Sequence, residues 1–310
     1  MDVLIDDSIK RITQNPLIAM SEFFAEKEIF TIDTRFIKNA RSLRGFMTQI
    51  INDKRKLNDP EACDIISLLL GDENYQNTDE LIDDVLVMFI AGSKTVQNTT
   101  TNLITTLLHE PDQMARMRAT VDPFMAKVSD NIMEKMTMDS VEEAEYIKMA
   151  YQEVMRRDAP LQASSTSCMS KDIKICGVEM KKGEAFFVDI LALHNDKEQW
   201  RQPELFVPDR FDPSSEWYLK PDGGKRSHFA YVPFLGGTRV CLGKTFAEVT
   251  LRFTVPLWFH FFDFAFTKEE HKKERPALIL GAYKSPEIPL KLTNRNKVAD
   301  LPNFQIQATN

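Results

Sequence analysis

Apolar residues recur every three or four positions along most of the chain, which is the period of an amphipathic α-helix. Between residues 9 and 57 this pattern predicts two or three helices, with apolar positions such as Phe36, Leu43 and Met47 on one face. We therefore expect residues 9–57 to be mainly helical.

The same period continues over residues 78–110, where one long helix is predicted, with Thr78 as its N-cap and Pro111 as its stop signal. Residues 86–92 are almost wholly apolar, so this helix is expected to cross the core. Residues 139–157 predict another helix, acidic at its start and basic at its end, as the helix dipole favours.

A different pattern appears in residues 164–190, where short alternating and β-branched runs surround Gly177 and Gly183 and predict strands and hairpins. A terminal hairpin is expected over residues 276–292, followed by a frayed tail over 294–310. The predicted fold class is mainly α with small β-sheets, in one domain covering residues 1–310.

Composition narrows the functional classes. The chain has 310 residues, of which 43% are hydrophobic, so it can bury a sizeable core. Its net charge of −7 implies no general affinity for nucleic acid. The four cysteines are widely spaced and none forms CxxC, which indicates a reducing, intracellular compartment without a disulfide framework. No uninterrupted apolar run is long enough to span a bilayer.

The candidate chemistry lies in residues 234–243, Phe-Leu-Gly-Gly-Thr-Arg-Val-Cys-Leu-Gly, which we call the cysteine loop. Cys241 precedes an apolar run with helical character over residues 245–259, and the positive end of a helix dipole favours the thiolate form. A buried, inert free cysteine is the alternative reading for a lone cysteine. A cysteine nucleophile is disfavoured, because no histidine stands in a recognisable relation to Cys241.

This loop resembles the cysteine-ligand loop of the cytochrome P450 family, the haem-thiolate monooxygenases, whose pattern is Phe-x-x-Gly-x-Arg-x-Cys-x-Gly. The matching positions are Phe234, Gly237, Arg239, Cys241 and Gly243. The resemblance implies haem b with Cys241 as the axial thiolate ligand of iron and Arg239 bound to a propionate. It also implies that Phe234 packs near the sulfur, and that the two glycines let the backbone approach the haem.

A second part of the resemblance lies inside the predicted helix 78–110. The family carries Ala/Gly-Gly-x-Asp/Glu-Thr over the haem, and Ala91, Gly92 and Thr95 match it. The resemblance implies that Thr95 assists oxygen activation, while Ala91 and Gly92 make room. Lys94 stands where the family has its acid, which puts the usual carboxylate–alcohol proton relay in doubt.

Glu153 and Arg156 are three residues apart, so they share one helix face and can pair. The family has a Glu-x-x-Arg pair here, joined by an arginine from a later loop, and Arg210 is the matching residue. This resemblance implies a structural clamp that holds the cysteine loop. Cys168 stands where the family usually has an arginine that binds a propionate. A metal site at His194 is not expected, since no partner lies at ligand spacing.

The resemblance covers residues 78–292, and family members are substantially longer, so the chain looks like the C-terminal part of such a protein, incomplete at the N-terminus. The upstream Trp-x-x-x-Arg motif, which binds a propionate, has no counterpart. Eukaryotic members usually carry an N-terminal anchor, so association of the full-length protein with the endoplasmic reticulum membrane is expected.

The reaction implied is insertion of one atom of dioxygen into a small apolar organic substrate, with electrons from a reductase partner. A haem-thiolate isomerase or dehydratase acting on a peroxide is a second possibility, which Lys94 favours. A non-catalytic haem-binding fragment is a third, favoured by the missing propionate contacts and Cys168.

Overall fold

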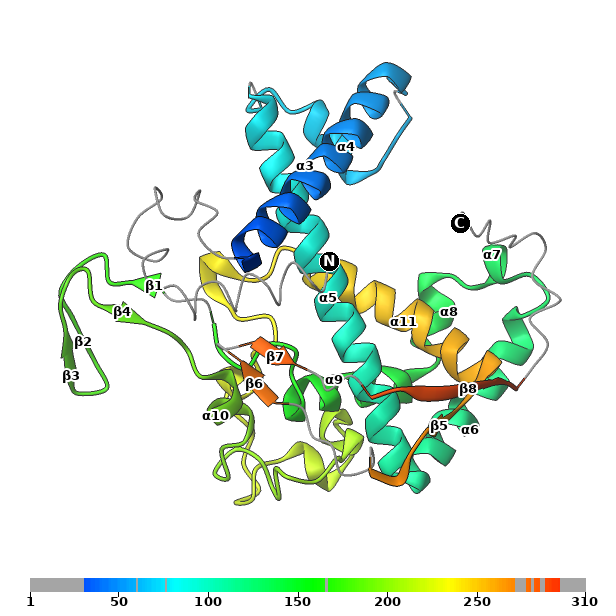
Figure 1. The fold of residues 1–310 in the computed structure, drawn as a ribbon. Helices are drawn as coiled ribbons and strands as arrows, with labels where there is room; N and C mark the ends of the chain where they lie inside the picture. The colour runs from blue at the N-terminus through cyan, green and yellow to red at the C-terminus, as the bar shows by residue number, and fades with distance from the viewer. Residues whose placement is uncertain are drawn as a thin grey trace. The chain divides into compact units, whose positions relative to one another are not determined.

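The computed structural model describes residues 31–59, 61–75, 77–164, 167–270, 277–279, 282–284 and 288–295 (Figure 1). It is mainly helical with small two-stranded sheets, which confirms the predicted fold class. Contacts divide the chain into two compact units, one ending at Lys94 and the other beginning at Thr95. The predictions for residues 9–30 and for the tail after residue 295 lie outside the described residues.

The described helices and strands follow one another in chain order. The α-helices are α3 (Thr31–Leu57), α4 (Ile65–Leu70), α5 (Thr78–His109), α6 (Pro111–Val128), α7 (Ile132–Lys135), α8 (Met138–Glu142), α9 (Glu145–Arg157), α10 (Ile190–His194) and α11 (Lys244–Phe261). The 3₁₀ turns are η2 (Pro208–Phe211), η3 (Glu216–Tyr218), η4 (His228–Ala230) and η5 (Gly237–Arg239). The strands are β1 (Ser167–Cys168), β2 (Ile173–Ile175), β3 (Val178–Met180), β4 (Ala185–Phe186), β5 (Phe262–Phe266), β6 (Ala277–Ile279), β7 (Ala282–Lys284) and β8 (Leu290–Asn294).

The first unit is built on α3, which runs unbroken over its described residues. Met47 and Ile51 of α3 pack against apolar residues of the first turns of α5 and are buried with them. The Asp64 side chain caps α4 by accepting a hydrogen bond from the Ser67 N–H group. Lys54 donates to the same carboxylate and, as the largest cause, lowers the pKa of Asp64 to about 2.

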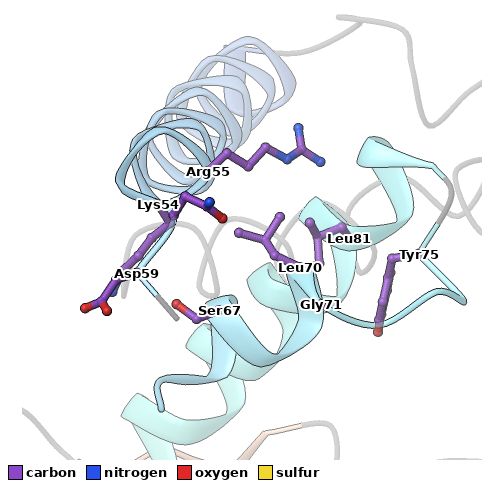
Figure 2. Close-up of a pocket in the computed structure, with 9 residues that line it drawn as sticks. Lys54, Arg55, Asp59, Ser67, Leu70, Gly71, Tyr75 and Leu81 are labelled. Atoms are coloured by element: carbon purple, nitrogen blue, oxygen red, sulfur yellow. The ribbon is translucent and has the colours of Figure 1, made fainter. Parts of the chain in front are cut away.

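A pocket in this unit lies where the end of α3 meets α4 and the start of α5 (Figure 2). Lys54 and Arg55 of α3 line it together with Ser67, Tyr75 and Leu81. It contains none of the predicted site residues, so the candidate chemistry must be sought elsewhere.

The second unit has one apolar core. Helix α11 packs on α6, α8 and α9, and its buried residues Leu251, Val255 and Phe259 join the buried faces of the other helices. Helix α11 continues through Pro256 to Phe261.

The single helix predicted over residues 139–157 is wrong, because the structure has α8 and α9 with a break between them. At the break, Glu143 and Ala144 donate backbone hydrogen bonds three residues back, to Ser140 and Val141, as in a 3₁₀ turn. Val141, Ala144 and Ile147 are buried at a spacing of three. The tighter turn keeps all three on the core face.

The hairpins expected in residues 164–190 are present, with β1 pairing with β4 and β2 with β3. Cys176 (φ 48°) and Gly177 (φ 86°) form the two-residue turn between β2 and β3. The terminal hairpin is shorter than predicted. Strands β6 and β7 pair with each other, whereas β8 pairs with β5.

Thr78 is the first helical residue of α5 rather than its N-cap, because the Asn77 side chain accepts from the Asp79 N–H group. Within the described ranges, no helix is long and apolar enough to cross a membrane.

Candidate functional site

The cysteine loop connects the core to the start of α11. Phe234 is partly buried and packs against the core cluster of the second unit. The loop then turns through η5, and Gly243 caps α11, with its carbonyl accepting from the Ala247 N–H group at 2.9 Å. Cys241 therefore lies three residues before the first residue of the helix.

The backbone of the loop closes on itself. The N–H group of Cys241 donates to the Phe234 carbonyl at 3.0 Å, which fixes the two ends of the loop together. Between them, Leu235 (φ 60°) and Gly237 (φ 69°) adopt left-handed conformations. A β-carbon is disfavoured in this region, so Gly237 is the better suited of the two residues.

The outer surface of the loop is open and apolar. Cys241 is free and exposed, Leu242 is 85% exposed and Val240 is also exposed, as is Phe246 in the first turn of α11. A β-carbon placed on Gly236 or Gly237 would meet nothing within 4 Å. The chain itself therefore does not need glycine there for space. Apolar side chains and open glycines beside a free thiol fit a flat, apolar group with a metal that accepts sulfur.

A cluster of charged residues, Glu153, Arg156 and Arg210, lies in the same unit, and we call it the Glu153 cluster. All three side chains are 0% exposed. The Glu153 carboxylate accepts from Arg156 Nε at 2.7 Å and Nη2 at 2.8 Å, which is a bidentate pair. Arg210 Nε donates to Glu153 Oε1 at 3.1 Å, and the Val207 N–H group donates to the same oxygen at 3.0 Å.

The remaining guanidinium donors of this cluster bind backbone carbonyls. Arg156 donates to the carbonyls of His194 and Pro203 at 2.9 and 2.7 Å, and Arg210 donates to those of Arg201 and Gln202. Burial lowers the pKa of Arg210, and its ion pair with Glu153 opposes that effect. The cluster thus fixes the loops after α10 onto the last turns of α9.

Aromatic rings cover the guanidinium groups. Trp200 is buried, and its ring lies 5.2 Å from the Arg156 guanidinium and 4.4 Å from that of Arg226. The Trp217 ring lies 5.0 Å from the guanidinium group of Arg210. These are cation–π distances. Burial, followed by the charge of Arg210, lowers the pKa of Arg226 to about 10, which leaves it charged at neutral pH.

His194 ends α10 and is fully buried. Its Nδ1 lies 3.1 Å from the Arg156 carbonyl oxygen, and its Nε2 accepts from the Val232 N–H group at 2.9 Å. Burial lowers its pKa to about 4, so the ring is neutral at physiological pH. Sequence spacing addresses only whether His194 could bind a metal. It therefore does not predict that the ring connects Arg156 to Val232 by hydrogen bonds.

The remaining predicted site residues lie on α5. Ala91 and Thr95 are four residues apart and Gly92 and Thr95 three apart, so they share one helix face. Ala91 is exposed, while Gly92 and Thr95 are partly buried. Their roles, like that of Lys94, stay predictions.

Comparison with known proteins assigns the chain to a family. The family profile described as Cytochrome P450 matches residues 3–291. The chain belongs to the cytochrome P450 family. The family resemblance found in the sequence is confirmed.

Curated P450 relatives are similar at low identity. Cytochrome P450 3A6 from Oryctolagus cuniculus is 25% identical over 235 residues, which cover 73% of this chain and 44% of the relative. Probable cytochrome P450 6a13 from Drosophila melanogaster is 27% identical over 300 residues, covering 93% of this chain and 55% of the relative. The P450 chain thus spans about half the length of the curated relatives it matches.

Solved P450 structures share the fold. Retinoic acid bound cyanobacterial CYP120A1 matches with a TM-score of 0.69 and 25% identity, over 85% of this chain and 58% of that one. A cytochrome P450 described as CYP102L1 matches with a TM-score of 0.72 and 19% identity, over 87% and 59% of the respective chains.

Sequence reasoning missed several residues that complete the site. Arg226 and Trp217 fell in a stretch that reads only as a polar loop, and no helix or strand spacing links them to their partners Trp200 and Arg210. The sequence feature that could have indicated these residues is the presence of tryptophans together with arginines in a chain that is acidic overall. Several arginines are buried around one carboxylate, and aromatic rings provide further favourable contacts for their guanidinium groups.

Proposed function

We propose that this P450 chain binds haem b through the Cys241 thiolate and acts as a monooxygenase on a small apolar organic substrate. One atom of dioxygen would enter the substrate, and a reductase partner would supply the electrons. The observation that carries the proposal is the free, exposed thiol in an open glycine loop with uncovered apolar side chains. Membership of the P450 family supports the same reading.

Each loop residue has a role in this proposal. Cys241 holds the iron, and its position before α11 places it near the positive end of the helix dipole. Arg239 is exposed in η5, where a long cationic side chain can pair with a propionate carboxylate. Gly237 and Gly243 let the backbone approach, and Phe234 anchors the loop to the core. When bound, haem supplies the dioxygen chemistry, and a thiolate ligand favours O–O cleavage.

The residues of α5 complete the proposal. Thr95 would hold a proton near the reacting oxygen through its hydroxyl group, and Ala91 and Gly92 would leave space on the same helix face. The Glu153 cluster would act as a structural clamp, because its side chains are buried and hydrogen-bond one another and backbone groups. We propose no substrate beyond the class of small apolar organic molecules.

A second function is favoured by Lys94. A haem-thiolate isomerase or dehydratase acting on a peroxide requires neither electrons from a reductase nor the carboxylate of the usual proton relay. Rearrangement or dehydration of an organic hydroperoxide by the haem-loaded chain, without any electron donor and without transfer of oxygen to a second molecule, would favour this second function over the monooxygenase. Strict dependence on a reductase would favour the monooxygenase.

The first experiment is the absorption spectrum of the purified chain supplied with haem, reduced and exposed to carbon monoxide. We expect a strongly red-shifted Soret band in the wild-type chain and its loss in Cys241→Ala. Cys63→Ala is the matched control, since Cys63 is also free and exposed but belongs to the other compact unit. It should keep the band.

Two results would overturn the proposal. A red-shifted band that survives in Cys241→Ala would exclude this residue as the ligand. The absence of such a band from every variant, including wild type, would mean that this chain does not hold haem through a thiolate, which leaves a non-catalytic fragment as the better description.

A further inference from the structure

The Glu153 cluster and the cysteine loop are joined through one buried ring. His194 and Arg156 exchange two hydrogen bonds: Arg156 Nη1 donates to the His194 carbonyl at 2.9 Å, and His194 Nδ1 lies 3.1 Å from the Arg156 carbonyl oxygen. The other nitrogen of the ring, Nε2, accepts from the Val232 N–H group at 2.9 Å. Val232 stands two residues before the cysteine loop begins.

These bonds fix the chemical state of the ring. A carbonyl oxygen can only accept, so Nδ1 must carry the proton, and Nε2 must be unprotonated to accept from an N–H group. The neutral tautomer with Nδ1–H satisfies both requirements at once. Neither an imidazolium nor the other neutral tautomer can make the two bonds together.

The connection continues into the loop through backbone hydrogen bonds. The Val232 carbonyl accepts from Leu235 N–H at 3.0 Å, and the Phe234 carbonyl accepts from Cys241 N–H at 3.0 Å. The ring itself has little freedom, because it is 0% exposed and stacks on Tyr231 with 5.4 Å between centroids. Tyr231 Oη in turn donates to the Gln152 carbonyl on α9 at 3.1 Å.

We propose that His194 is a positioning residue that transmits the rigidity of the Glu153 cluster to the cysteine loop, by holding the Val232 amide in place through Nε2. The role differs from that of the clamp, whose hydrogen bonds within the described part of the chain go to His194 and the loops after α10 and not to the cysteine loop. The proposal rests on the proposed function only for its consequence at the haem, since the positioning itself is a property of the haem-free chain.

The test uses two variants that each restore one half of the bridge. In His194→Gln the longer amide places its oxygen near the position of Nε2, where it can accept from Val232. In His194→Asn the shorter amide reaches the position of Nδ1, where it can donate to Arg156 but cannot reach Val232. His194→Phe keeps a ring against Tyr231 and removes both bonds.

The readout is amide hydrogen exchange of the full chain without haem, at Val232, Leu235 and Cys241. We expect exchange on the order of tenfold faster in His194→Asn and His194→Phe than in wild type, because a donor loses its buried acceptor. His194→Gln should exchange within about threefold of wild type. Exchange at buried amides of α6 serves as the internal control that each variant is folded.

Equal exchange in the Gln and Asn variants would overturn the proposal, because His194 would then act only as a core side chain. If His194→Phe does not fold, the Gln and Asn variants decide alone. A second readout is the share of the haem–carbon monoxide complex with the red-shifted thiolate band, which should be retained in Gln and reduced in Asn. If no variant holds haem, the proposed function fails while the exchange result still stands.

Discussion

The Glu153 cluster and the cysteine loop lie in the same compact unit but are built in opposite ways. In the cluster, charged side chains are 0% exposed and their polar atoms bind one another and backbone carbonyls. In the loop, apolar side chains face solvent, with Leu242 85% exposed, and one residue that is not glycine adopts a positive φ. Polar groups have been buried and apolar groups exposed.

This difference indicates that the Glu153 cluster and the cysteine loop have separate structural roles. Burying charge without compensation is strongly destabilising, so rearranging a cluster in which every guanidinium nitrogen has an acceptor would cost much free energy. An exposed apolar loop gains stability only when another group covers it. The rigid region therefore holds the backbone, and the open region presents the thiol.

The largest expected effect on stability comes from a change in the Glu153 cluster. Glu153→Gln removes the carboxylate that pairs with Arg156 and Arg210 and leaves two buried cations uncompensated. We expect a loss of about 3–5 kcal/mol in the free energy of unfolding, measured by urea titration. Glu143→Gln is the matched control, because Glu143 pairs with Lys127 at the surface, and it should change stability by less than about 1 kcal/mol. Similar losses of unfolding free energy in Glu153→Gln and Glu143→Gln would show that the buried cluster is no more important for stability than a surface ion pair.

The second effect concerns the ring between the two regions. His194 titrates at about 4 in the folded chain and near 6.5 when unfolded, so protonation favours the unfolded chain. Its contribution is fully present above pH 6.5 and is lost as the pH falls toward 4, to a total of about 3 kcal/mol. The Arg156 charge adds to the burial effect, and the ionisable Tyr231 ring stacks on the imidazole.

Urea titrations at several pH values between 4 and 7 give the free energy of unfolding of wild type and of His194→Gln. The difference between the two measures the pH-dependent contribution of His194. Carboxylates with lowered pKa values, such as Asp122, lose their stabilisation only below about pH 4, and they do so equally in both chains, so they cancel in that difference. Parallel curves for the two chains would show that His194 is not kept neutral by the fold.

The smallest effect lies in the open loop. Gly237 has φ 69° and open space around it, so Gly237→Ala should be destabilising by about 1 kcal/mol through backbone strain alone. Gly236 is extended, with φ −164°, and is equally open, so Gly236→Ala should be neutral or slightly stabilising. Urea titration of both variants separates strain from packing. A larger loss at Gly236 would show that the loop is packed rather than open.

Much of this arrangement was predictable from sequence where the controlling interactions are local. The helical periods predicted helix over the residues of α3, α5 and α11, and the spacing of Glu153 and Arg156 predicted that they share one helix face. The turn at Cys176 and Gly177 followed from its glycine. The family resemblance added Arg210, which is 57 residues from Glu153 in the sequence.

The remainder depends on contacts that leave no local pattern. The pairing of β5 with β8 joins residues about thirty positions apart and made the predicted terminal hairpin too long. The break between α8 and α9 keeps buried residues on one face and needs neither proline nor glycine. His194 binds backbone atoms, which every residue possesses, so no side-chain motif marks its partners.

The tryptophans give the rigid region its own optical signal. The chain has only three, and Trp200 and Trp217 both stack on guanidinium groups of the Glu153 cluster or beside it, while Trp258 lies on α11. Because indole emission depends on neighbouring charge and on contact with water, intrinsic fluorescence reports mainly on the packing of this cluster. Loosening of the cluster can therefore be followed in the unlabelled chain, separately from any change in the absorption of bound haem.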